Sequence, residues 1–198
     1  MQIFTFYRSR VAILLCTDSI QLHASSMGMR REARERAVQF LFQHDMNRPD
    51  KLEEALDHFW HSQRPAEGKP SRETGHEAHE EDPKEKEQQA LRSFADPLIR
   101  GTLEHLDQVD ALIRQYAKNW RLERIAVVDR NILRLALYEM TCREDIPPVV
   151  SINEAVDIAK KFSTAESGKF VNGLLDRAKA DLMRSARTAT DPVKTMAR

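Results

Sequence analysis

Two histidine pairs are the first residues in this chain whose spacing could support chemistry. His58 and His61 are three positions apart, as are His76 and His79, and this spacing places two side chains on one face of a helix. Neither pair has an evident third ligand of the kind that zinc requires. The sequence also lacks a Gly-rich phosphate loop, a nucleophile elbow and a His-Glu-x-x-His motif. We therefore interpret the histidines as solvated and predict no enzyme, no metal and no cofactor.

Clustered arginines indicate binding instead of catalysis. Guanidinium groups bind phosphates in a bidentate manner and stack on unpaired bases. The start of the first predicted helix carries four of them: Arg30, Arg31, Arg34 and Arg36. The alternative is a solvated helix face partly neutralised by Glu32 and Glu35. The spacing alone leaves both interpretations open.

A second basic segment, Lys169-Phe170-Val171-Asn172-Gly173, opens the last predicted helix and follows Lys160 and Lys161. A positive helix start beside an aromatic ring suits single-stranded RNA, because bases stack on the ring and phosphate meets the backbone amides. The alternative is that Phe170 belongs to the core and Gly173 provides clearance between helices.

Hydrophobic residues spaced three and four apart predict helices throughout, and no segment alternates as a strand would. The segment from about 123 to 143 is apolar on most sides and should be central. A capping box, Ser151 with Glu154, should start the next helix. We expect Trp60 and Trp120 to fill the core or its rim. The remaining predicted helices cover 30–46, a segment that begins at Asp50 and stops at Pro65, the region from Phe94 to Tyr116 with a bend near Gly101, and the end of the chain after Ser167.

Segments of unusual composition divide the chain. Residues 65–90 hold eight acidic and four basic residues, with alanine as the sole apolar type, which predicts a mobile acidic loop. The apolar run near the start has six residues, too few for the roughly 7–15 of a signal peptide. We expect residues 1–28 to be an extension without a folded role, residues 29–184 a helical domain, and residues 185–198 a flexible tail.

The global composition excludes some classes of protein. The formal net charge of zero means that any nucleic-acid site must be a local patch. No apolar run approaches the roughly 20 residues that span a bilayer. The two cysteines, Cys16 and Cys142, do not form a disulfide framework and indicate a reducing cytoplasm.

Four segments, taken in order, resemble the NusB family of bacterial transcription antitermination factors. The resemblance covers about residues 29–183, apart from the acidic loop. The segments are Arg30 to Gln39 (RREARERAVQ), Val128 to Glu139 (VDRNILRLALYE), Ile152 to Val156 (INEAV) with Ala159-Lys160, and Lys169 to Asp176 (KFVNGLLD).

The resemblance implies an all-α fold of about seven helices in two packed helical subdomains. It also implies binding of single-stranded boxA-type RNA of ribosomal RNA leaders together with NusE, a ribosomal small-subunit protein, within the RNA polymerase antitermination complex that promotes read-through. The implied RNA-binding residues are Arg30, Arg31, Arg34, Arg36, Lys169 and Phe170. The implied NusE-binding residues are Phe42, which replaces a tyrosine of some members, Glu123 and Asp129.

Two alternatives remain open on the sequence. One is a helical scaffold that binds proteins only. The other is the RNA-binding module of a ribosomal RNA methyltransferase. Its catalytic domain would be missing, because the chain leaves no room for one after its helices. The role of Asp129 is also open, because it could simply cap a helix instead of meeting a partner.

Overall fold

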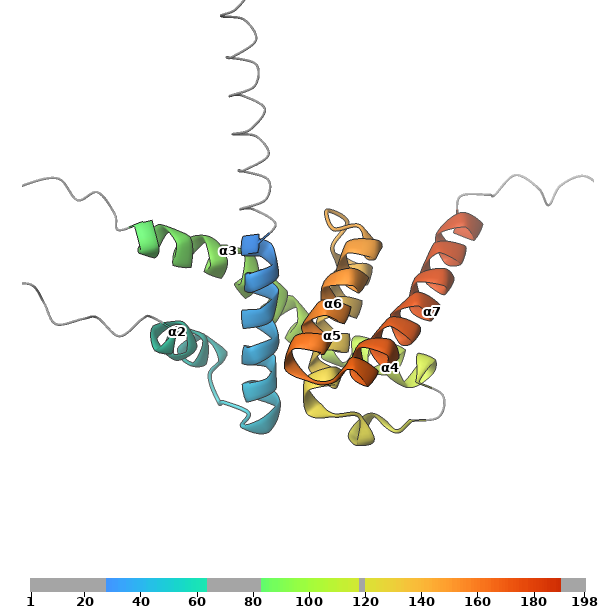
Figure 1. Cartoon of the computed structure of the whole chain (residues 1–198), viewed down its shortest axis with the longest axis horizontal. Helices are drawn as coiled ribbons and strands as arrows, with labels where there is room; N and C mark the ends of the chain where they lie inside the picture. Colours follow the sequence, from blue (N-terminus) through green and yellow to red (C-terminus); the bar gives the residue numbers. More distant parts are fainter. Residues whose placement is uncertain (1–27, 64–82, 118–119, 190–198) are drawn as a thin grey trace, which may run out of the picture.

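Helices joined by short turns form the described part of the chain, as the sequence predicts (Figure 1). The computed structural model describes residues 28–63, 83–117 and 120–189. No strand occurs in these ranges, so the all-α class is confirmed. The elements are the first helix (28–46 in its described part), α2 (Leu52–Ser62), α3 (Pro83–Glu104), α4 (Leu106–Tyr116), the 3-10 turn η1 (Leu122–Arg124), α5 (Val127–Cys142), α6 (Pro148–Phe162) and α7 (Ala165–Ala189).

The helices pack as two groups, the first helix with α2 and α3, and α4 with α5, α6 and α7 (Figure 1). In the first group the ring of Phe40 packs edge-on against Phe59, with 5.5 Å between centroids. Trp60 is buried there and donates from Nε1 to Asp96 Oδ1 at 2.7 Å. This confirms the core position that we predicted for Trp60.

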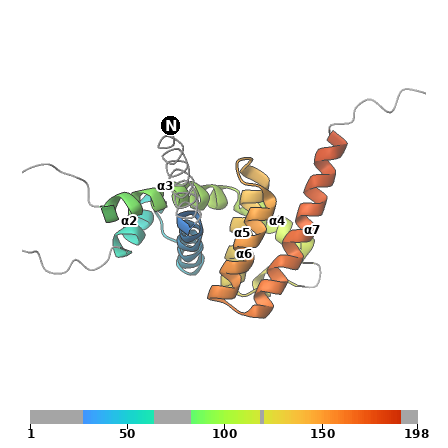
Figure 2. The same cartoon turned by 45° about the horizontal axis from the view of Figure 1, so that its top comes forward.

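Helix α5 is central, as its apolar sequence indicates, and contacts α3, α4, α6 and α7 (Figure 2). Where α3 crosses it, Tyr138 lies against Gly101. A Cβ atom at Gly101 would lie 1.9 Å from Tyr138 Oη, so the approach of the two helices requires glycine there. Helix α3 continues through Gly101 and ends at Glu104, so the chain breaks at His105, later than the predicted bend.

The predicted mobile loop at 65–90 is wrong in its last part, because α3 begins at Pro83. Proline is favourable at the first helical position, and residues 84–89 are Lys, Glu and Gln, which are strong helix formers. Gln88 Nε2 also donates to the carbonyl of Trp60 at 3.0 Å, which ties this turn to α2. Residues 64–82, with His76 and His79, lie outside the described residues.

The predicted capping box is also wrong, because α6 begins three residues earlier, at Pro148. Ser151 is therefore a buried interior residue whose Oγ has no hydrogen-bond partner. Proline with its fixed φ is a stronger start signal than the Ser-x-x-Glu pattern here. Likewise α5 begins at Val127 and not near Glu123, since Ile125 has an extended backbone that separates η1 from α5.

Helix α7 begins earlier and ends later than its sequence suggested. Thr164 caps its start, because Thr164 Oγ1 accepts a hydrogen bond from the amide of Ser167 at 3.0 Å. Its helical backbone continues to Ala189, within the segment predicted as a tail from residue 185. Residues 1–27 and 190–198 lie outside the described residues. No helix in the described ranges combines the length and apolar character needed to cross a membrane.

Candidate nucleic-acid interface

Arg31 joins the first helix to α6. Its guanidinium donates to both carboxylate oxygens of Glu154 at 2.9 and 3.0 Å, and to Asp157 Oδ2 at 3.0 Å. The hydrogen bond with Glu154 raises the pKa of Arg31 above its ordinary value. The side chain is still 47% exposed. Arg31 is therefore a permanent cation at the surface, already engaged by two carboxylates.

Arg34 does not face the surface, which disagrees with the RNA-contacting role that the family resemblance implies for it. Its side chain is 5% exposed, and Nε donates at 2.8 Å to Glu139 Oε1, which is 1% exposed. Its guanidinium also lies over the ring of Phe94, 5.2 Å from the centroid. Arg34 is therefore the partner of a buried carboxylate in α5 and holds the first helix against that helix.

Arg30 and Arg36 lie on either side of this buried contact. Arg30 is exposed and its guanidinium lies 5.8 Å from the centroid of the Phe94 ring. Arg36 is partly exposed and pairs with Glu32 at 3.0 Å, one turn earlier. Both can reach a ligand, whereas Arg34 in the same helix cannot.

A groove of about 470 Å³ separates the first helix from the end of α6. Lys161 Nζ pairs with Glu35 Oε2 at 2.6 Å, and both residues line this groove. Charged and polar side chains of both signs therefore line it, together with Gly28 and Phe162. They are Arg31, Glu32, Glu35, Arg36, Gln39 and Lys161.

The start of α7 adds a further cation beside the end of α6. Gly168 packs on Lys160, where an added Cβ would lie 3.0 Å from Lys160 Cγ. Lys169 is exposed and pairs with Glu166 at 2.8 Å. Phe170 is partly buried and packs against the core. The structure thus brings Arg31, Lys161 and Lys169 onto three consecutive packed helices, which their separation in sequence does not show.

Trp120 lies outside the core and is mostly exposed, although we expected it to fill the core or its rim. Its side chain is 57% exposed and its ring lies 6.1 Å from that of Phe170, tilted by 57°. Sequence reasoning missed it because a tryptophan in a helical protein is usually buried. Its position in a turn between two helices, between Asn119 and Arg121, was the available signal.

An ion-pair network connects the elements that carry the predicted NusE-binding residues. Asp45 Oδ2 in the first helix accepts hydrogen bonds from Arg130 and Asn131 and pairs with Arg134 at 3.0 Å, all three in α5. Arg134 also binds Asp110 of α4 through two bonds of 2.7 and 2.8 Å. Burial opposes ionisation of Asp45, but the arginines outweigh it and hold the pKa of Asp45 below its ordinary value.

The three predicted partner residues differ in accessibility. Phe42 is 36% exposed on the first helix, one turn before Asp45, and Glu123 is exposed in η1. Arg130 Nη1 also donates to the carbonyl of Leu122 at 3.4 Å, which draws η1 to the same network. Asp129, in contrast, is buried in the first turn of α5, and its Oδ1 has no hydrogen-bond partner. It forms no cap bond. A carboxylate in the first turn of a helix still interacts favourably with the positive end of the helix dipole.

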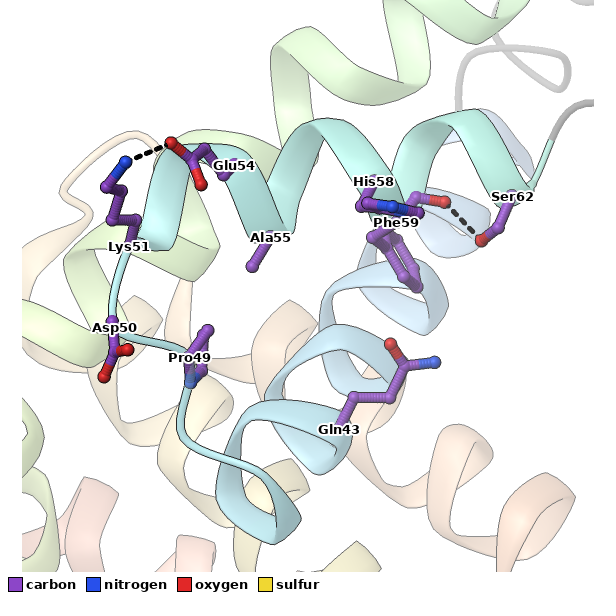
Figure 3. A pocket seen from close by; sticks show the side chains of 9 residues that line it. All are labelled: Gln43, Pro49, Asp50, Lys51, Glu54, Ala55, His58, Phe59 and Ser62. Carbon is purple, nitrogen blue, oxygen red and sulfur yellow. Dashed lines mark hydrogen bonds and ion pairs between the residues drawn. The ribbon is translucent and has the colours of Figure 1, made fainter.

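A second groove, of about 570 Å³, lies between the end of the first helix and α2 (Figure 3). Gln43, His58 and the edge of Phe59 face it, with Lys51 and Glu54 paired at its rim. Within the described residues, no three His, Cys, Asp or Glu side chains are grouped to hold a metal ion.

Comparisons with known proteins agree with one another. The chain matches the NusB family over residues 31–180. It is 42% identical over 155 residues to the transcription antitermination protein NusB of Thermodesulfovibrio yellowstonii, which covers 75% of this chain and 89% of that protein. The structure of T. maritima NusB superposes with a TM-score of 0.57 at 38% identity, over 77% of this chain and 91% of that one. A crystal structure of antitermination factors NusB and NusE in complex with dsRNA shares the fold, with a TM-score of 0.59 at 22% identity over 78% of this chain and 98% of that one.

Proposed function

Because the chain belongs to the NusB family, we propose that it is a transcription antitermination factor that binds boxA-type RNA of ribosomal RNA leaders together with NusE. It acts by binding, without catalysis, on nascent transcripts in the cytoplasm and as part of the RNA polymerase antitermination complex. A relative described as transcription antitermination protein NusB, aligned over 89% of its length, supports the assignment, and a chain of the solved complex of NusB and NusE with RNA has the same fold.

The basic surface across three helices carries this proposal. The first helix contributes Arg30, Arg31 and Arg36, and α7 contributes Lys169 and Phe170, with the end of α6 between them. Cations spaced along such a surface can follow an RNA backbone, and a partly accessible ring can receive an unstacked base. Arg34 supports the surface from beneath, through its pair with Glu139.

NusE binding is assigned to the other end of the first helix. The Asp45 network fixes Phe42 relative to η1 and α5, so that Phe42 and Glu123 belong to one rigid surface. Asp129 contributes its charge from behind this surface. One helix therefore presents cations for RNA near its start and an apolar ring for a protein near its end.

A titration of labelled boxA-type RNA with the full chain, with and without NusE, tests the function. We expect binding that weakens as salt concentration rises and tightens when NusE is present. An RNA of the same length and shuffled sequence is the control. Equal affinity for both RNAs with NusE present, or no RNA binding at all, would contradict the proposal. NusE binding without RNA binding would instead favour a scaffold that binds proteins only.

A further inference from the structure

Trp120 is the largest side chain that the fold leaves open to solvent in the described ranges, with 57% of its surface exposed. Its backbone amide donates to the carbonyl of Ala117 at 2.8 Å, which ties the backbone of Trp120 to the end of α4. The turn thus presents an indole ring at a defined place. Tryptophan is enriched at binding interfaces and among the residues that contribute most to binding energy.

The ring of Trp120 forms an aromatic pair with Phe170. The centroids are 6.1 Å apart and the planes are tilted by 57°. Phe170 packs partly against the core and is held by α7, so it fixes one side of the indole. More than half of the Trp120 side chain remains accessible, which leaves room for a flat ligand to stack.

The charge around this pair is positive. Residues 120–124 hold Arg121 and Arg124 against Glu123, and both arginines are exposed. Lys169, next to Phe170, extends the positive charge onto α7. Aromatic rings flanked by cations suit unpaired nucleotides, whose bases stack while their phosphates meet the cations.

We propose that Trp120 and Phe170 together form a stacking site for an unpaired base of the RNA, so that the RNA surface extends past α7 to the turn between α4 and η1. This inference rests on the proposed function. A protein occupant is the alternative, because Glu123 of the NusE surface is three residues away. The positive charge favours RNA.

Substitutions at Trp120 in the full chain test the site. Trp120→Ala should weaken binding of boxA-type RNA about 5- to 150-fold, the range for loss of one base–aromatic stack, and leave the salt dependence unchanged because no charge is removed. Trp120→Phe keeps a ring and should retain most of the affinity. Val149→Ala is the matched control. Val149 is an exposed apolar residue at the start of α6, away from the end of α6 that borders the RNA surface, so this variant should bind as the wild type does.

Tryptophan fluorescence gives a second readout that does not depend on affinity. The chain has two tryptophans, and Trp60 is buried and hydrogen-bonded to Asp96. RNA should therefore quench the emission of Trp120 in the wild type, and this quenching should be absent in Trp120→Phe. An unchanged melting temperature of all three variants will show that the fold is intact.

The outcomes separate this inference from the proposed function. If the wild type binds RNA while Trp120→Ala binds equally well and no quenching occurs, the stacking site is refuted and the proposed function stands. If Trp120→Ala weakens NusE binding alone, Trp120 belongs to the protein surface and the inference is wrong. If the wild type binds no RNA, both proposals fail.

Discussion

Substitution of Arg34 by alanine distinguishes the structural role of this arginine from a role in RNA contact. Arg34 and Glu139 form a buried ion pair, with side chains 5% and 1% exposed and a bond of 2.8 Å. Removal of the guanidinium leaves the buried Glu139 carboxylate, near the end of α5, without its counter-ion. Loss of one member of such a pair costs about 3–5 kcal/mol of unfolding free energy, and the lost contact with the Phe94 ring adds to it.

Arg31→Ala is the matched control on the same helix. Arg31 is half-exposed and its carboxylate partners can be solvated, so the cost to folding should be about 0–1 kcal/mol. Arg31→Ala should change the salt dependence of RNA binding more than Arg34→Ala does. Loss of one phosphate contact lowers the slope of log affinity against log salt by about 0.7 for single strands, whereas folded Arg34→Ala should keep the slope of the wild type.

Urea denaturation and RNA titrations at several salt concentrations measure both effects. Glu139→Gln added to Arg34→Ala should restore part of the lost stability, because the uncompensated charge is removed. The reasoning is refuted if Arg34→Ala unfolds within about 1 kcal/mol of the wild type, or if its salt slope falls as much as that of Arg31→Ala.

Three further predictions concern other parts of the fold. Phe42→Ala should weaken NusE binding at least about tenfold if this exposed ring is a hot spot, while RNA affinity without NusE stays unchanged; calorimetry that finds equal NusE affinity would exclude Phe42 from the interface. Gly101→Ala should lower the unfolding free energy by about 1–3 kcal/mol, because the new methyl group overlaps Tyr138; an unchanged melting temperature would show that Tyr138 moves freely. Burial, Arg48 and Arg134 lower the pKa of His44 in the folded protein, and Asp45 opposes them. Neutral His44 is therefore favourable to the fold above the unfolded pKa of about 6.5. This contribution to stability is lost as the pH falls from there through the folded pKa. His44→Gln should therefore lose less stability than the wild type between about pH 7 and pH 5, and equal losses in urea titrations would contradict this.

The helices were predictable because their hydrophobic spacing is a local property, and the central position of α5 followed from its apolar composition. The residues at which α3 and α6 begin were harder to predict from the sequence. In each case a proline begins the helix, while we relied on the acidic composition of residues 65–90 and on the Ser151–Glu154 pattern. Composition describes how much apolar surface a segment can bury, but it does not exclude a solvated helix whose last turns are packed.

The arginine surface shows why spacing cannot give the role of each residue. Arg30 and Arg34 share one face of the first helix, yet Arg30 is exposed while Arg34 is covered by α5, where it binds Glu139, 105 residues away in sequence. One signal did exist in the sequence. Glu139 lies within a helix that is apolar on most sides, and a buried carboxylate there favours a cationic partner, for which an arginine of the first helix was one candidate.

The cations assigned to RNA already have carboxylate partners within the protein. Arg31 pairs with Glu154 and Asp157, and Lys169 pairs with Glu166. On the RNA surface that we propose, a phosphate must therefore replace or share a carboxylate at these positions, and the gain in electrostatic free energy is smaller than for a free cation. This agrees with a chain of zero net charge, which attracts polyanions only weakly at long range. Discrimination between RNAs must then come mostly from short-range contacts with bases, and the accessible rings of Phe170 and Trp120 are the side chains best placed to provide them.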